Sequence, residues 1–144
     1  MIPATNPETG YLPPGVHRAS WDEVASRFGG NGHRARLMDG LLAACRRLAV
    51  AGCSEILLDG SFVTEKTMPG DYDGTWEIVG VELDRLDPVF LDASNGFAEV
   101  RDRYLGDLYP AGAAEPGVSF RDFLQTDREG VEKGVVLIDL RSLP

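Results

Sequence analysis

The sequence predicts a mixed α/β (α+β) fold, in which a small mixed sheet is covered by helices. Apolar residues recur at helical spacing in several segments, and two short continuous apolar runs have the composition of buried strands. The predicted elements follow the order helix, helix, strand, strand, helix, helix, strand, which is typical of helices packed on one sheet. The length of 144 residues and the absence of an internal repeat indicate a single domain.

The N-terminal third is predicted to contain an arm and two helices. Residues 1–19 include four prolines and two glycines, so we expect an extended arm there, followed by a single domain over residues 20–144. Ser20 and Glu23 fit a capping box, which predicts that a short helix begins at this point. An apolar stripe over residues 33–51 predicts the longest helix of the chain.

The remaining elements are predicted from shorter patterns. Strands are expected at 56–58, 72–81 and 133–140, helices at 84–93 and 97–108, a loop at 109–117, and one helical turn at 119–125.

The chain is acidic, with a net charge of −9 and a pI near 4.6. An acidic field repels phosphate backbones, which argues against non-specific nucleic-acid binding. Residues 27–47 nevertheless hold five arginines against one aspartate. Two interpretations are open for this segment, a solvated helix face or a local anion site.

The two cysteines and the hydropathy pattern indicate a reducing compartment. Cys45 and Cys53 have neither metal-ligand spacing nor the pattern of a disulfide framework, so we expect buried free thiols. Residues 1–16 lack the apolar run of a signal peptide, and no apolar stretch approaches the roughly 20 residues that span a bilayer. We therefore expect a cytoplasmic protein without a membrane partner.

The chemistry-bearing segment follows the first predicted strand. Gly60-Ser61 ends that strand, where glycine permits a tight turn and the serine hydroxyl and nearby amides suit a phosphate. Asp71 and Asp73 lie two residues apart at the start of the next strand, so their side chains share a face. Two adjacent carboxylates repel each other unless a cation neutralises them, and Mg²⁺ prefers such oxygen ligands. Taken alone, each half is more often a plain turn or a pair of solvated aspartates.

The segment from Gly60 to Asp73 resembles the active-site signature of the polymerase-β-like nucleotidyltransferase superfamily. It is similar to an uncharacterised group of small bacterial members that share a Gly-Ser-Phe-x-Thr-x-Lys-x-x-Pro-x-Asp-x-Asp core, which Lys66 also fits. Gly74 departs from the superfamily, which usually has an apolar residue there, and a glycine indicates a weakened strand or a bulge. Larger members of the superfamily have a separate nucleotide-base-binding or acceptor-binding domain, which we do not expect within these residues.

The resemblance implies roles for particular residues. Asp71 and Asp73 would hold two Mg²⁺ ions, and a third acidic residue on a neighbouring strand would complete the catalytic metal site. Asp139, within the last apolar strand, is the best match for that third acid, although an exposed edge-strand aspartate is the alternative. Gly60 and Ser61 would bind the nucleotide phosphates. Lys66 would either assist them as a point charge or be a surface residue.

The resemblance therefore implies a Mg²⁺-dependent nucleotidyltransferase that moves a nucleoside monophosphate from a nucleoside triphosphate such as ATP to an acceptor. A protein or small-molecule acceptor is expected because of the acidic field, and minimal superfamily members include toxin–antitoxin pairs. The alternative is a catalytically silent binding module, either an antitoxin-like partner or a nucleotide sensor. Lys133, before the last strand, is interpreted as structural.

Overall fold

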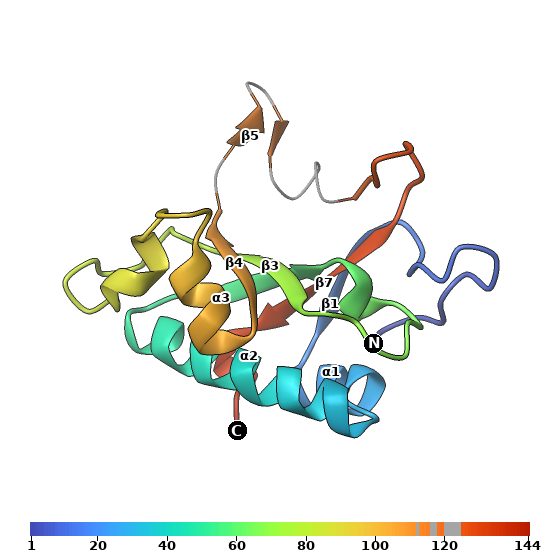
Figure 1. Ribbon diagram of the computed structural model, residues 1–144, viewed down its shortest axis with the longest axis horizontal. Helices are drawn as coiled ribbons and strands as arrows, with labels where there is room; N and C mark the ends of the chain where they lie inside the picture. The colour runs from blue at the N-terminus through green and yellow to red at the C-terminus, as the bar shows by residue number, and fades with distance from the viewer. Residues whose placement is uncertain (112, 116–117, 120–124) are drawn as a thin grey trace.

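A five-stranded mixed sheet forms the centre of the computed structural model, which describes residues 1–111, 113–115, 118–119 and 125–144 (Figure 1). The strand order is β1-β7-β2-β3-β4, with parallel pairs at both edges and antiparallel pairs between them. The strands of this sheet are β1 (Gly15–Ala19), β2 (Glu55–Asp59), β3 (Tyr72–Trp76), β4 (Gly106–Pro110) and β7 (Gly134–Asp139). A separate antiparallel pair joins β5 (Ala113–Glu115) and β6 (Val118–Ser119). The predicted α/β class is confirmed.

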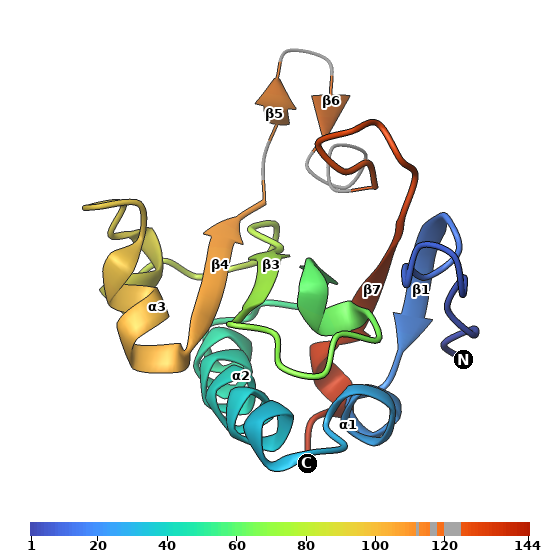
Figure 2. The same cartoon turned by 45° about the vertical axis from the view of Figure 1, so that its right-hand side comes forward.

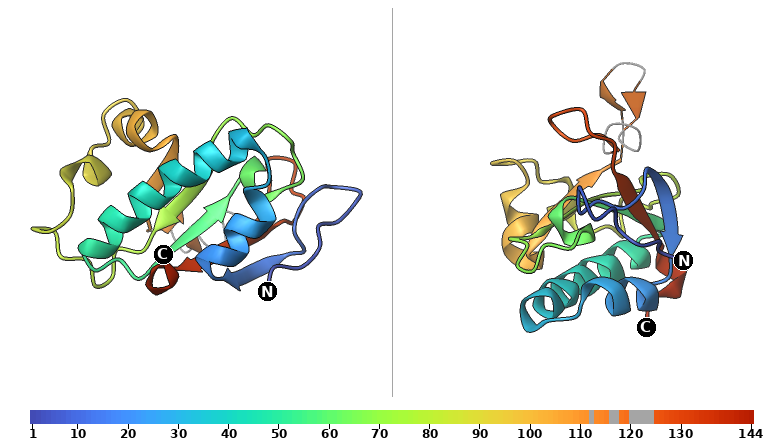
Figure 3. Two further views of the ribbon diagram at one scale, coloured as in Figure 1. Left: turned by 90° about the horizontal axis from the view of Figure 1, so that it is seen from below. Right: turned by 90° about the vertical axis from the view of Figure 1, so that its right-hand side faces the viewer.

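In the described part of the chain, three α-helices accompany the sheet: α1 (Trp21–Phe28), α2 (Gly32–Val50) and α3 (Ala98–Tyr104). Short 3₁₀ turns occur at η1 (Ser61–Val63), η2 (Pro88–Leu91) and η3 (Leu140–Ser142). The capping box of Ser20 and Glu23 forms at the start of α1 as predicted. Figures 2 and 3 show α1 and α2 lying together across one face of the sheet. No helix in the described part of the chain is both long and apolar enough to cross a membrane.

Strand alternation separates a core face from a second face. Ile56 and Leu58 of β2 belong to the main core with the helices, whereas Leu57 belongs to a small cluster with Val135 and Leu137 of β7. Alternate strand residues point to opposite faces, so Asp59 shares the face of Leu57. The strand aspartates considered below therefore lie on the sheet face that turns away from α1 and α2.

Several predicted boundaries are wrong in the structure. The N-terminal arm predicted over residues 1–19 is not separate from the domain, because residues 15–19 form β1 of the central sheet and pair in parallel with β7. The strand predicted over 72–81 ends at Trp76. The helix predicted over 84–93 is only the 3₁₀ turn η2, where Pro88 occupies the first turn.

The most consequential error is in the predicted helix over 97–108. α3 ends at Tyr104, because Leu105 adopts a left-handed conformation with φ 69°, and β4 begins one residue later. Leu105 and Leu108 continue the helical apolar spacing, which hid the strand. The loop predicted at 109–117 contains the end of β4 and all of β5, and part of it lies outside the described residues. The helical turn predicted at 119–125 begins at Ser119 of β6 and otherwise lies mainly outside them.

Candidate metal and phosphate site

Three carboxylates from β3 and β4 converge at one end of the sheet. Asp71 directly precedes β3, and Asp73 lies within it on the same face. Asp107 of β4 is the parallel register partner of Asp73. One carboxylate oxygen from each of the three residues lies within 4.8 Å of the others. The expected proximity of Asp71 and Asp73 is therefore present, and Asp107 is a third acid that the sequence prediction missed.

The surroundings of Asp71 and Asp73 disfavour the charged forms of these two carboxylates. Burial raises the pKa of Asp73 to about 7, with further contributions from the charges of Asp71, Asp107 and Asp59. Burial also raises the pKa of Asp71, and the charge of Asp107 adds to this while Arg101 opposes it. A divalent cation would relieve the repulsion that raises both pKa values.

The donor set fits a hard divalent cation. All three side chains are partly exposed carboxylates, which supply the oxygen ligands that Mg²⁺ prefers while leaving room for water and phosphate oxygens. Arg101 of α3 donates a hydrogen bond from Nε to Oδ1 of Asp107 over 2.7 Å. That guanidinium, 42% exposed, supplies part of the positive charge that the acidic cluster requires.

Two glycines allow the strands and carboxylates to approach so closely. Gly60 has φ 79°, and a Cβ there would lie 2.3 Å from Oδ2 of Asp73. Gly74, whose sequence context suggested a weakened strand or bulge, instead lies in continuous register with Leu58. A Cβ on Gly74 would lie 2.6 Å from the carbonyl oxygen of Leu57, so glycine is required for close strand packing.

Side chains at the start of α2 hold the loop between Gly60 and Asp71. Arg34 is buried and donates hydrogen bonds to the carbonyl oxygens of Phe28, Phe62, Thr64 and Lys66 over 2.5–3.2 Å. Asn31 and His33 contact the carbonyl oxygens of Thr67 and Pro69 further along the same loop. One arginine of the basic segment thus fixes the loop from inside and is neither a solvated residue nor an anion ligand.

A cavity of about 350 Å³ lies beside the predicted phosphate-binding residues. Its walls come from three separate parts of the chain and are lined by Thr9, Gly10, Tyr11, Gly60, Ser61, Thr64, Glu65, Lys66 and Lys133. Gly60, Ser61 and Lys66 are therefore brought together as predicted. Lys66 and Lys133, the two lysines of the chain, both line this cavity. From the sequence, only Lys66 was a candidate for phosphate binding.

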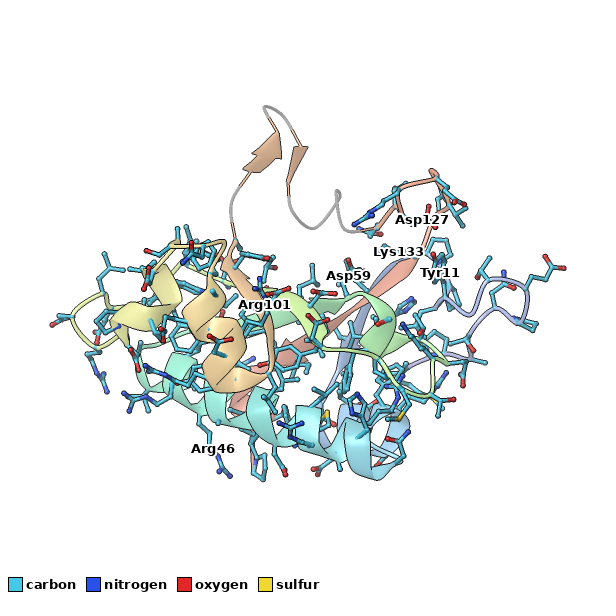
Figure 4. All side chains as sticks on the ribbon, in the orientation of Figure 1. Tyr11, Arg46, Asp59, Arg101, Asp127 and Lys133 are labelled. Carbon is cyan, nitrogen blue, oxygen red and sulfur yellow. The ribbon has the colours of Figure 1, made fainter. Side chains whose placement is uncertain are left out.

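Lys133 is paired with Asp59 at the end of β2. Lys133 Nζ lies 3.1 Å from Oδ2, to which it donates a hydrogen bond, and 3.0 Å from Oδ1. The geometry at Oδ1 does not suit a hydrogen bond. Oδ1 is therefore a buried oxygen that contacts the ammonium charge but accepts no hydrogen bond from the described residues. Figure 4 shows Asp59 and Lys133 together, with Tyr11 and Asp127 beside them.

The expectation that Asp139 supplies the third carboxylate is wrong. Asp139 is the register partner of Glu55, four residues before Asp59 on β2, which corresponds to about 13 Å along the strand. Its carboxylate binds Arg141 over 2.8–3.2 Å and lines a different cavity. Because β7 runs antiparallel to β2, its carboxyl end lies at the opposite end of the sheet from Asp73.

The chain belongs to DUF6932, a family of unknown function whose sequence model matches residues 3–139. The matched range includes the three converging carboxylates, the cavity residues and both lysines. No curated protein and no solved structure matches the chain significantly.

Proposed function

We propose that this protein is a divalent-metal-dependent nucleotidyltransferase that moves a nucleoside monophosphate from a nucleoside triphosphate to a protein or small-molecule acceptor. The observation that carries the proposal is the convergence of Asp71, Asp73 and Asp107 beside the Gly60-Ser61 cavity. A carboxylate cluster next to a cavity with two ammonium groups has the complementary charges that a metal–triphosphate needs.

Each group has a distinct role in this proposal. Asp71 and Asp73 hold Mg²⁺, and Asp107 takes the role of the third acid, holding metal and accepting the proton of the acceptor hydroxyl. Two bound Mg²⁺ ions would neutralise charge on the attacking and leaving oxygens of an in-line displacement. Gly60 permits close approach of the phosphates, while Ser61 and Lys66 bind them. Arg34 keeps the phosphate-binding loop in place through its carbonyl groups.

Labelled nucleotide transfer tests the proposal and identifies the acceptor. The purified chain is incubated with Mg²⁺, a cell lysate and each of the four α-labelled nucleoside triphosphates. We expect label on a defined acceptor with wild-type protein, and no label with the Asp73→Asn or Asp107→Asn variants. Asp139→Asn is the matched control and should label normally. Equal labelling by Asp107→Asn and wild type would contradict the proposed site.

The ion pair between Arg101 and Asp107 favours one alternative, a nucleotide-binding module without transfer. The guanidinium already neutralises a carboxylate that the transfer reaction needs free. In that case Mg²⁺-nucleotide would raise the melting temperature of the protein, but no label would reach any acceptor. An Arg101→Gln variant separates the two functions, since an enzyme should keep or gain transfer activity when the competing cation is removed.

A further inference from the structure

Asp59 is a fourth carboxylate in the same row of the sheet. It is the antiparallel register partner of Asp73, which is in turn the parallel partner of Asp107. Register partners on neighbouring strands have side chains on one face with Cβ atoms about 5 Å apart. The whole Asp59 residue is only 5% exposed to solvent, so the charge of its carboxylate requires a partner inside the protein.

Lys133 supplies that partner from a distant part of the chain. It directly precedes β7, and its ammonium group contacts both oxygens of Asp59, which lies 74 residues earlier. Neither side chain is well exposed, at 16% for Lys133 and 8% for Asp59. The ion pair therefore removes Asp59 from the group of carboxylates available to a cation.

The same ammonium group also borders the candidate phosphate cavity. Lys133 lines it together with Ser61 and Lys66, and only one of its hydrogen bonds is directed to Asp59. Tyr11 of the N-terminal arm also lines this cavity, and its hydroxyl donates a 2.7 Å hydrogen bond to Asp127. The backbone amide of Gly134 is fixed to the carbonyl oxygen of Leu12 over 3.0 Å, which anchors the residue next to Lys133.

We propose that Lys133 is a positioning residue with two exchangeable partners: the Asp59 carboxylate when the cavity holds no anion, and a phosphate oxygen when it does. This inference rests on the proposed function. While Lys133 binds Asp59, three carboxylates face the cation. When a phosphate chain draws the ammonium group away, the charge of Asp59 is added to the cation site. Anion binding in the cavity and cation binding at the carboxylates consequently reinforce each other.

Two separate calorimetric titrations test the exchange, one with Mn²⁺ alone and one with tripolyphosphate in the presence of EDTA. For Lys133→Met we expect the affinity for tripolyphosphate to fall about tenfold and the affinity for Mn²⁺ to rise about tenfold. The opposite signs are diagnostic, because a lysine that only stabilises the fold would weaken both. Unchanged tripolyphosphate binding, or unchanged or weaker Mn²⁺ binding, in a folded Lys133→Met variant would overturn the proposal.

Matched variants keep the test decisive if Lys133→Met does not fold. Lys66→Met should lose tripolyphosphate affinity without changing Mn²⁺ affinity, since no carboxylate is released. Asp59→Asn frees the ammonium group and should tighten tripolyphosphate binding about fivefold. The double variant Asp59→Asn/Lys133→Met removes both charges and should lose tripolyphosphate affinity without gaining Mn²⁺ affinity. A tripolyphosphate affinity of Asp59→Asn equal to or below that of wild type would also refute the exchange.

The wild-type titrations separate this inference from the proposed function. If wild-type protein binds neither Mn²⁺ nor tripolyphosphate, the proposed function fails and the exchange fails with it. If wild-type protein binds both ligands but the variants show no opposite changes, only the role assigned to Lys133 fails.

Discussion

Asp73 and Asp139 lie on the same face of one sheet, at its two opposite ends, and have contrary environments. Asp73 is partly buried and lies among other carboxylates, and both factors raise its pKa, to about 7. Asp139 receives hydrogen bonds from the side chain and backbone of Arg141, which lower its pKa. The Asp73 carboxylate thus lies among negative charges, whereas the Asp139 carboxylate is already paired with the guanidinium of Arg141.

The difference shows that the surroundings of an aspartate decide its role more than its place near the end of a strand does. Asp73 lies near the start of β3 and Asp139 at the end of β7, and both were candidates for the same metal site. Within the described part of the chain, the end that holds Asp71, Asp73 and Asp107 brings three carboxylates together beside the Gly60-Ser61 cavity, and Arg101 pairs with Asp107 alone among them. The predictions below test that contrast, beginning with the largest expected effect.

Asp73→Asn should abolish nucleotidyl transfer, with a loss of at least about 1000-fold, because the central metal ligand becomes a neutral amide. The rate of label transfer to the acceptor identified in lysate measures this loss. The same substitution should leave the metal-free protein as stable as wild type or more stable, since it removes charge repulsion. A transfer rate above about one-tenth of the wild-type rate would contradict the role of Asp73 as a metal ligand.

Arg34→Met should destabilise the protein by about 3 kcal/mol, because four carbonyl groups lose their hydrogen-bond donor and two of these hydrogen bonds, to Phe28 and Phe62, are buried. Arg141→Met is the control at the other end. Its guanidinium is 88% exposed, so its loss should change the free energy of unfolding far less than the loss of Arg34 does. Urea unfolding monitored by tryptophan fluorescence measures both values, and equal losses would remove the contrast between the two ends.

The raised pKa of Asp73 predicts a specific pH dependence in metal-free protein. Its folded-state pKa of about 7 lies above the ordinary value of 3.8, so the native state binds the extra proton between these values. Stability should fall as pH rises from about 4 to about 7, by roughly 1–2 kcal/mol after screening by water at a partly exposed group. Chemical unfolding across this range in EDTA should show the slope, and Asp73→Asn should flatten it.

Asp139→Asn should have the smallest effect, a stability change below about 1 kcal/mol at pH 7. The lowered pKa of Asp139 adds stability that is complete above its ordinary pKa of 3.8 and is lost only as pH falls through the lower folded-state value. Thermal unfolding should therefore show that wild type loses slightly more stability between pH 7 and pH 3 than the variant, which lacks the titrating carboxylate. An effect on Mg²⁺ binding at pH 7 would contradict the separation of the two ends.

Local patterns were sufficient to predict α1, α2, β2 and β7. The capping box of Ser20 and Glu23 and the long apolar stripe of α2 depend only on neighbouring residues. The proximity of Asp71 and Asp73 also follows from the two-residue strand period. Such features are set within a few residues and need no knowledge of how strands pair.

The third carboxylate depended on strand order, which the local pattern does not contain. Asp107 lies in the five-residue strand β4, directly after a left-handed Leu105, and the helical spacing of its apolar neighbours concealed it. The alternation of polar Asp107 and Tyr109 with buried Leu108 was the available signal. Lys133 and Asp59 were missed as a pair because only the fold brings residues 74 positions apart into contact.

The most direct test is calorimetric titration of Mg²⁺ into wild type, Asp107→Asn and Asp139→Asn, each with a non-hydrolysable nucleoside triphosphate present. If the metal site is formed by Asp71, Asp73 and Asp107, then Asp107→Asn should weaken Mg²⁺ binding by at least about tenfold and Asp139→Asn should match wild type. Equal binding by Asp107→Asn and wild type, or a loss confined to Asp139→Asn, would contradict the site.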